Sequence, residues 1–268
     1  GRFRGGPVAR PSLARFAGGF TAMDFQGKTA LVTGGARRLG KAIALALARR
    51  GAGVVVHHRT SAAEAAAFVE ELRKIGAGAW AVQADLALPE AAAGLVSRAA
   101  DASGTSIDWL VNNASIFTES RVDSFSPEDL AANIGINALA PALIARSFAA
   151  QGRAGAIVNL LDARMTDYDG GHAAYHLSKR MLASLTSMMA VAYAPRIRVN
   201  AVAPGLILPP QGKDAAYLAD LAHTNPLNAH GDPEDVAQAA VFLLESRFIT
   251  GQVLYVDGGR HLRGRMYE

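Results

Sequence analysis

Short apolar, β-branched runs alternate with segments of helical periodicity along the chain from Lys28 onward. The runs are not interrupted by polar residues, which indicates strands buried on both faces, as in a parallel sheet covered by helices. We therefore predict a single-domain, doubly wound α/β fold of the Rossmann type, with about seven parallel strands and helices on both faces. The predicted strands are residues 29–34, 53–58, 79–86, 107–114, 155–163, 196–205 and 251–259, and the predicted helices are residues 38–52, 61–76, 89–102, 133–150, 173–192 and 232–246. We predict that Ser61 and Asp232 cap the N-termini of the second and the last of these helices, with Pro233 at the first helical position of the last.

Two segments fall outside this alternation. Residues 1–23 are rich in Gly, Pro and Arg, and we expect them to be disordered or to be an extension upstream of a natural start at Met23. An organellar presequence is the alternative, but the Gly and Pro content argues against it. Residues 206–230 form a long Pro-rich stretch of the kind that often covers an active site. We predict that residues 24–268 form one domain.

The charge and composition exclude several classes of protein. The formal net charge is +4, and residues 1–23 alone carry four arginines and no acid, so the remaining 23 basic and 23 acidic residues balance. A neutral body disfavours binding to nucleic acid. The chain has no cysteine, which excludes disulfides and thiolate metal sites. No apolar run approaches the roughly 18–20 residues of a membrane span. We expect a cytoplasmic protein with no metal site.

The stretch Thr33–Gly40, TGGARRLG, joins the first predicted strand to the first predicted helix. In this setting, backbone N–H groups and a helix N-terminus can hold a pyrophosphate. Gly34 and Gly40 would supply the turn and the close approach of the helix. Position 38, however, is an arginine where such a loop has a glycine. We expect Arg37, Arg38 and Leu39 to lie along the phosphates; taken alone, the motif could equally be a plain strand-to-helix turn.

The end of the second predicted strand favours NADP(H) over NAD(H). A carboxylate at this position would bind the ribose 2′-OH and repel a 2′-phosphate, but the chain instead has His58, Arg59, Thr60 and Ser61. Arg59 can bind a phosphate with two parallel hydrogen bonds, and the hydroxyls can donate. We predict that the cofactor site is completed by Asp85, Leu86, Asn113, Ala114, Ser115, Tyr175, Lys179, Pro204 and Gly205.

The stretch YHLSK places Tyr175 and Lys179 four residues apart, on one face of a predicted helix. A phenol with a pKa near 10 is a poor acid or base at neutral pH. A neighbouring ammonium group favours the ionised phenol, so we expect Lys179 to lower the pKa of Tyr175. Lys179 can also reach a ribose hydroxyl.

The order and spacing of these motifs resemble the short-chain dehydrogenase/reductase family over about residues 26–260. The motifs are the TG loop, NNA at 112–114, Asn137, the Tyr175–Lys179 pair, and PG at Pro204–Gly205. The resemblance implies nicotinamide hydride transfer, with Tyr175 as proton donor, Lys179 on the ribose and Asn137 holding a water of a proton relay.

One departure from the family points to the substrate. The family normally has a serine thirteen residues before the tyrosine, where this chain has Asp162. An ionised carboxylate cannot donate to a ketone oxygen, and beside a phenol it opposes ionisation. It suits a substrate with ring N–H donors that takes a proton on nitrogen.

Arg38, HHRTSAAEA, NNASIF, LLDARMT and DGGRHLR resemble the pteridine and dihydromonapterin reductases. This resemblance implies that Phe117 stacks on a pterin and that the other substrate contacts are Arg38, Ser115, Asp162, Tyr175 and Leu206. Ile207 departs from a serine found in some of that group.

Two alternatives remain. A short-chain ketone reductase, acting on a 3-oxoacyl thioester or a small carbonyl, would favour serine at position 162. A non-catalytic NADP-sensing regulator would tend to lose the Tyr175–Lys179 pair, which this chain keeps. The family resemblance also implies a homotetramer; residues 181–194 would either form an interface or pack on the sheet, and Arg263 near the C-terminus could reach a neighbouring subunit's site.

Overall fold

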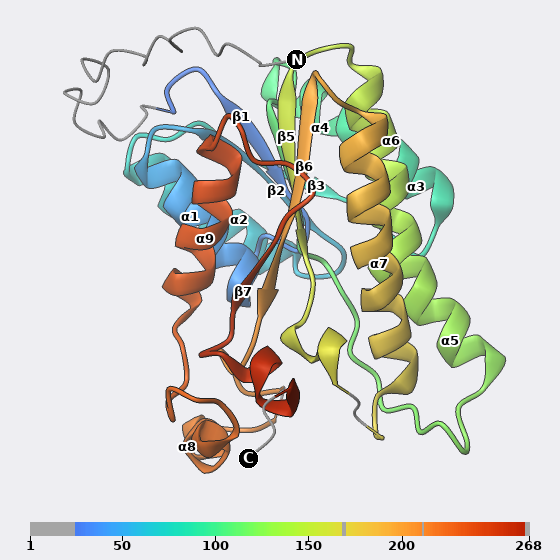
Figure 1. Ribbon diagram of the computed structural model, residues 1–268. Helices are drawn as coiled ribbons and strands as arrows, with labels where there is room; N and C mark the ends of the chain where they lie inside the picture. Colours follow the sequence, from blue (N-terminus) through green and yellow to red (C-terminus); the bar gives the residue numbers. More distant parts are fainter. Residues whose placement is uncertain (1–24, 168–169, 211, 266–268) are drawn as a thin grey trace, which may run out of the picture.

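The computed structural model describes residues 25–167, 170–210 and 212–265, so the expectation for residues 1–23 concerns a segment outside these ranges. Within them, seven parallel strands form one sheet in the order β3-β2-β1-β4-β5-β6-β7 (Figure 1). The strands are β1 (Thr29–Val32), β2 (Gly53–His58), β3 (Ala79–Gln83), β4 (Trp109–Asn112), β5 (Gly155–Leu160), β6 (Ile197–Pro204) and β7 (Val253–Val256). The predicted doubly wound fold is confirmed.

Along the sequence, one or more helices follow each of the first six strands. They are α1 (Arg38–Arg49), α2 (Ala62–Lys74), α3 (Pro89–Ala93), α4 (Leu95–Ser103), α5 (Pro127–Ile134), α6 (Ala140–Ala150), α7 (Ala173–Ala192), α8 (Ala215–Leu221) and α9 (Pro233–Glu245). A π-helical turn, η2 (Gly135–Leu139), joins α5 to α6, and three short 3-10 helices are η3 (Ala163–Thr166), η4 (Ala222–Thr224) and η5 (Arg260–Arg265). No helix in the described ranges is both long and apolar enough to span a membrane.

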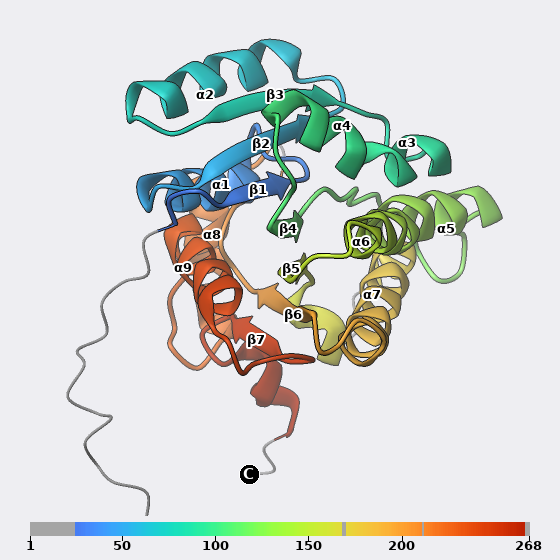
Figure 2. The ribbon, with the colours of Figure 1, turned by 90° about the horizontal axis from the view of Figure 1, so that it is seen from above.

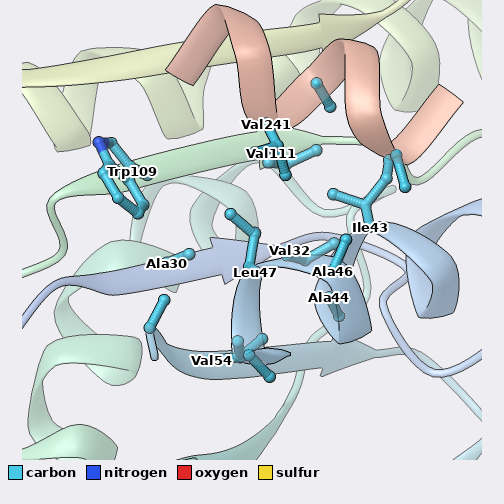
Figure 3. Close-up of a cluster of buried hydrophobic side chains, with 14 of the residues drawn as sticks. Ala30, Val32, Ile43, Ala44, Ala46, Leu47, Val54, Trp109, Val111 and Val241 are labelled. Atoms are coloured by element: carbon cyan, nitrogen blue, oxygen red, sulfur yellow. The ribbon is translucent and has the colours of Figure 1, made fainter. Parts of the chain in front are cut away.

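The helices cover both faces of the sheet (Figure 2). Helices α1, α2 and α9 pack on one face, and α3, α4, α6 and α7 pack on the other. On the first face, Val32, Ile43, Leu47 and Val54 are fully buried, with Val241 of α9 packed beside them (Figure 3). Burial of each such side chain contributes roughly 1.5–3 kcal/mol to the stability of the fold. The packing on this face therefore holds α1, α2 and α9 against the sheet.

Local signals explain several helix ends. Asp232 caps α9 as predicted: its Oδ1 accepts from Glu234 N at 2.9 Å, and Asp235 Oδ2 accepts from Asp232 N at 2.8 Å. Such a capping box is typically worth about 1 kcal/mol. Ser61 does precede α2, but its side chain makes no capping hydrogen bond, so the capping role predicted for it is wrong.

Three predicted boundaries differ from the structure. The helix expected at 133–150 begins earlier, at Pro127, because Ser126 and Asp129 form a capping box there, and the π-helical turn then interrupts it. The helix expected at 89–102 breaks at Gly94 into α3 and α4. The stretch 206–230, for which no periodicity was found, contains α8 and η4.

The parallel arrangement brings the carboxyl ends of all seven strands to one edge, the lower edge in Figure 1, where α8 also lies. Strand β1 lies between β2 and β4, so the strand order reverses direction at this point. A crevice forms at such a switch point, outside the carboxyl ends of the strands.

Candidate active site

A groove with a volume of about 450 Å³ runs along this edge of the sheet. Most of the predicted site residues line it: Gly34, Arg37, Arg38, Leu39, His58, Arg59, Thr60, Ser61, Asp85, Leu86, Asn113, Ala114, Ser115, Asp162, Tyr175, Lys179, Pro204 and Gly205. Four predicted residues are not part of the lining: Gly40, Phe117, Asn137 and Leu206. Residues that sequence reasoning missed also line it, among them His57, Ile116, Ile136, Leu161, Ile207 and Leu208. These are mostly apolar residues with no motif to mark them.

The turn after β1 is held tightly against the start of α1. Gly34 adopts a left-handed φ of 61°, which favours glycine. A Cβ on Gly40 would overlap the carbonyl oxygen of Gly34, so only glycine lets the helix approach this closely. The amide of Asn113 donates to Thr33 O at 2.9 Å and to Gly34 O at 3.2 Å, and thereby fixes the turn from the β4 side. The roles predicted for both glycines fit this geometry.

Arg38 keeps the backbone conformation of the glycine that it replaces. Its φ is 53°, in the left-handed region, which is strained for a long side chain. Its guanidinium donates from Nη2 to the carbonyl oxygen of Pro209 at 2.7 Å, a contact that the sequence did not predict. Arg38 therefore links the turn between β1 and α1 (residues 33–37, called the phosphate turn) to the 206–230 stretch. Arg37 lies 3.5 Å from Glu64 in an exposed ion pair.

The far end of the groove, beyond β2 and β3, is polar and basic. His58 is buried, and its Nδ1 has no hydrogen-bond partner among the described residues. Such an orphaned polar atom in a groove wall is costly unless a ligand or water satisfies it. Arg59 and Thr60 are exposed at the rim. Asp85 Oδ1 accepts from Ala87 N at 3.0 Å, a local hydrogen bond that shapes the loop after β3.

Tyr175 and Asp162 form the polar centre of the groove. The Tyr175 hydroxyl donates to Asp162 Oδ2 at 3.0 Å, and Asp162 Oδ1 accepts from Arg164 N at 2.8 Å. Burial raises the pKa of Tyr175 well above its usual value of 10, and the charge of Asp162 and its hydrogen bond raise it further. The expectation that Lys179 would lower this pKa is wrong, because burial and Asp162 prevail.

Lys179 is buried on the same side of α7, 3% exposed. Its Nζ donates to Leu160 O at 2.7 Å and lies 5.6 Å from the centre of the Tyr175 ring. Burial lowers the pKa of Lys179 to about 8, although the charge of Asp162 opposes this shift. Lys179 is therefore protonated at neutral pH and loses its proton under mildly basic conditions.

Asn137 lies within the π-helical turn and is 1% exposed. Its Oδ1 accepts from Ile116 N at 2.8 Å, and its Nδ2 donates to Ile116 O at 3.0 Å and to Ser178 Oγ at 3.0 Å. π-Helical turns often occur at functional sites. The side chain of Asn137 thus joins the loop after β4 to α7, one turn from Tyr175.

Phe117 lies next to the catalytic candidates but outside the groove lining. Its ring packs edge-on against Tyr175, with centroids 4.7 Å apart and an interplanar angle of 89°. One face of the ring stacks on His172 at 3.9 Å. The side chain is 47% exposed, so it is not an ordinary core residue.

These residues fit a dinucleotide phosphate. The glycine turn and the start of α1 offer backbone N–H groups, the β2 end offers an unsatisfied histidine nitrogen and a cation, and a buried ammonium group lies beside the tyrosine. Among the described residues that line the groove, the acidic ones are Asp85 and Asp162, and the side chains at the phosphate end are basic or neutral.

Known proteins resemble this chain in sequence and in fold. A family profile described as enoyl-(acyl carrier protein) reductase matches residues 34–261. The structure resembles FolM alternative dihydrofolate reductase 1 from Brucella canis in complex with NADP (34% identity, TM-score 0.83, 92% of this chain and 98% of that chain). It also resembles a short-chain dehydrogenase/reductase from Serratia marcescens (31%, TM-score 0.84, 89% and 100%).

A curated relative is subunit BbsD of the (2S)-[(R)-hydroxy(phenyl)methyl]succinyl-CoA dehydrogenase of Thauera aromatica, which is 34% identical over 90% of this chain and 99% of its own. The family profile covers most of the chain, and the solved structures share its fold over about nine-tenths of its length. The chain belongs to the short-chain dehydrogenase/reductase family.

Proposed function

We propose that this oxidoreductase uses NADPH to reduce a pterin, a dihydropteridine such as dihydrobiopterin or dihydromonapterin, with dihydrofolate as a further candidate. Its cofactor is NADP(H), as in the FolM structure from Brucella canis that it resembles. The observation that carries the pterin proposal is the hydrogen bond between the Tyr175 hydroxyl and the Asp162 carboxylate in the groove.

Asp162 selects for a substrate that donates hydrogen bonds. Its two oxygens accept from Tyr175 and from the Arg164 backbone, and an ionised carboxylate has room for further donors. A pterin ring presents N–H groups, whereas a simple ketone presents only acceptors. A ketone oxygen beside Asp162 would meet a second hydrogen-bond acceptor in place of a donor.

Tyr175 holds the proton that the ring nitrogen would take. Its raised pKa keeps the phenol neutral but also makes it a weak acid, so the proton would pass only as hydride transfer makes the ring nitrogen strongly basic. Bound NADPH supplies the hydride for the neighbouring carbon. Asp162 orients the phenol, and Lys179 and Asn137 lie on the inner side of Tyr175, where they would complete a relay.

The remaining residues would hold the two ring systems in contact. Phe117 is half-exposed and perpendicular to Tyr175, and one face of its ring stacks on His172, so a flat heterocycle would have to stack on the other face. Such stacking adds roughly 0.5–1.5 kcal/mol beyond simple burial. Holding both reactants in the correct geometry is itself a large part of catalysis. Arg59, Thr60 and Ser61 would bind the 2′-phosphate, and Lys179 a ribose hydroxyl.

A ketone reductase is the second candidate. The relative from Thauera aromatica is by name a dehydrogenase of a hydroxyacyl-CoA, which supports oxidation or reduction of a thioester substrate at this site. Asp162 in place of a hydroxyl donor is the feature that opposes it. The retained Tyr175–Lys179 pair opposes a purely regulatory protein.

We expect NADPH oxidation with dihydrobiopterin, dihydromonapterin or dihydrofolate and little with an acetoacetyl thioester, in parallel absorbance assays. Asp162→Ser and Tyr175→Phe should each lower kcat/KM for the pterin at least about 100-fold, the usual size of a general-acid contribution. Asp123→Ser, which removes an exposed carboxylate that does not line the groove, serves as control. If pterin reduction survives both substitutions, the assignment is wrong.

The pKa of Lys179 predicts a pH profile. The ammonium form, which can bind a ribose hydroxyl, is present below the pKa of about 8 and is lost above it. We expect kcat/KM for NADPH to be level near pH 7 and to fall up to about tenfold per pH unit above pH 8. Lys179→Met should lower kcat/KM near pH 7 and abolish its fall above pH 8. A wild-type profile that stays flat to pH 9.5 would contradict the role.

Arg38 offers a test of the contact to Pro209. Arg38→Gly suits the left-handed backbone but removes the guanidinium, so we expect unchanged stability together with a several-fold higher KM for both NADPH and pterin. Arg153→Gly, which removes an exposed arginine that precedes β5 and does not line the groove, is the control. A rise in the KM for NADPH alone would show that Arg38 serves the cofactor and that the contact to Pro209 is dispensable.

We also propose a homotetramer. Helix α7 buries Leu182 and Met189 against the sheet but leaves an apolar stripe exposed, formed by Leu177, Met181, Met188 and Val191. The predicted alternatives for residues 181–194 thus both have support, on opposite faces of one helix. A second copy would cover the stripe. Arg263, which contacts His223 O in this chain, remains a candidate for reaching a neighbour.

Light scattering should give the mass of four chains for the wild type and a smaller assembly for a Met188→Glu, Val191→Glu double variant, since charge on the stripe opposes its burial. Glu128→Lys, on an exposed helix start, is a control that should keep the wild-type mass. A wild-type monomer would refute the proposal.

A further inference from the structure

The imidazole of His57 lies between the phosphate turn and the end of β3, and it is 2% exposed. The Gly34 backbone N–H donates to Nδ1 at 3.1 Å, and Nε2 lies 3.2 Å from the carbonyl oxygen of Ala84. One ring thus bridges two neighbouring loops that line the groove: the turn for the pyrophosphate and the loop that carries Asp85.

These two contacts fix the proton on the ring. A backbone N–H can only donate, so Nδ1 must carry a lone pair. A carbonyl oxygen can only accept, so Nε2 must carry the hydrogen. The ring is therefore neutral in a single tautomer. Burial lowers the pKa of His57 to about 4, which agrees with a ring that stays uncharged under ordinary conditions.

The backbone around His57 strengthens the bridge. Gly35 N donates to His57 O at 3.0 Å, and Ala84 N donates to His58 O at 3.0 Å. On the β4 side, the turn is held by Asn113, whose Nδ2 donates to Gly34 O at 3.2 Å. The imidazole thus sets the distance on the β2 side, as Asn113 does on the β4 side.

We propose that His57 is a positioning residue for the cofactor: a neutral imidazole in the Nε2–H tautomer that fixes the phosphate turn relative to the adenine end of the groove. Both ring nitrogens are used within the protein, so His57 acts through Gly34 and Ala84 and not as a ligand of the phosphates. This role concerns NADP(H) and is independent of which substrate is reduced.

The experiment compares three variants of His57 in full-length protein. His57→Phe keeps a flat ring without either hydrogen bond. His57→Asn places an amide oxygen near the position of Nδ1, and His57→Gln places an amide nitrogen near the position of Nε2. The control is Thr186→Val, which removes a hydroxyl that is equally buried but joins α7 to Asn159, away from the groove.

NADPH binding to the cofactor-free protein, followed by fluorescence titration, should weaken about tenfold or more in His57→Phe, because the buried Gly34 N–H loses its acceptor. His57→Asn should recover part of the affinity, and Thr186→Val should bind as the wild type does. At saturating NADPH, kcat and the substrate KM should stay near wild type. Unfolding temperatures separate affinity from stability.

A second measurement keeps the test open if His57→Phe does not fold. In the wild-type protein, ¹⁵N–¹H spectra of the histidine ring should show a lone-pair Nδ1 and a protonated Nε2 for His57 at neutral pH. The opposite tautomer or a charged ring would overturn the proposal. Wild-type NADPH affinity in His57→Phe would also overturn it. So would a loss of NADPH affinity in Thr186→Val that is as large, for the same loss of stability, as the loss in His57→Phe.

Discussion

The parallel direction of all seven strands is the constraint on which the rest of the molecule depends. It places every strand's carboxyl end at one edge of the sheet, so loops far apart in sequence meet there. Gly34 after β1, Asp85 after β3, Asn113 after β4, and Asp162 after β5 line one groove for this reason. Helices on both faces bury the strands and leave that edge as the place where polar groups can gather.

Within the groove, one hydrogen bond decides the chemistry that the site favours. Asp162 accepts from the Tyr175 hydroxyl, so the phenol remains a neutral acid, and its partner is a carboxylate instead of a second hydroxyl. Lys179, buried and cationic at neutral pH, balances this charge without contacting the phenol oxygen directly. Under the proposed function, a site built in this way would suit substrates that bring their own N–H donors.

The cofactor end depends on contacts that hold backbone in place. Asn113 and His57 hydrogen-bond the backbone of Gly34 from the β4 side and the β2 side. Gly40, which has no Cβ, allows the start of α1 to pack closely against the same turn. Arg38 stands where the loop motif has a glycine. It adopts the backbone conformation that glycine would have and extends its side chain to Pro209 in the stretch that follows β6.

Sequence reasoning succeeded where a signal is local. Continuous apolar runs predicted the strands, and Asp232 with Pro233 predicted the start of α9. The signal for α5 was also local, in Ser126 and Asp129, and was overlooked. Tertiary contacts were beyond reach: the Arg38–Pro209 contact joins residues 171 apart, and nothing near His57 marks its two partners.

The pKa of Tyr175 was misjudged for the same reason. The spacing of Tyr175 and Lys179 was visible in the sequence, but the depth of their burial was not, and burial proved to be the largest influence on both groups. A charge expected to ease ionisation of the phenol was outweighed by the loss of water around it.

The most direct test of the central claim is a crystal structure of the complex with NADP⁺ and a dihydropterin. The account predicts that the pterin lies between the nicotinamide and Phe117, with a ring N–H donated to Asp162 and the Tyr175 hydroxyl within hydrogen-bonding distance of a ring nitrogen. A pterin bound elsewhere, or one whose N–H groups face away from Asp162, would contradict it.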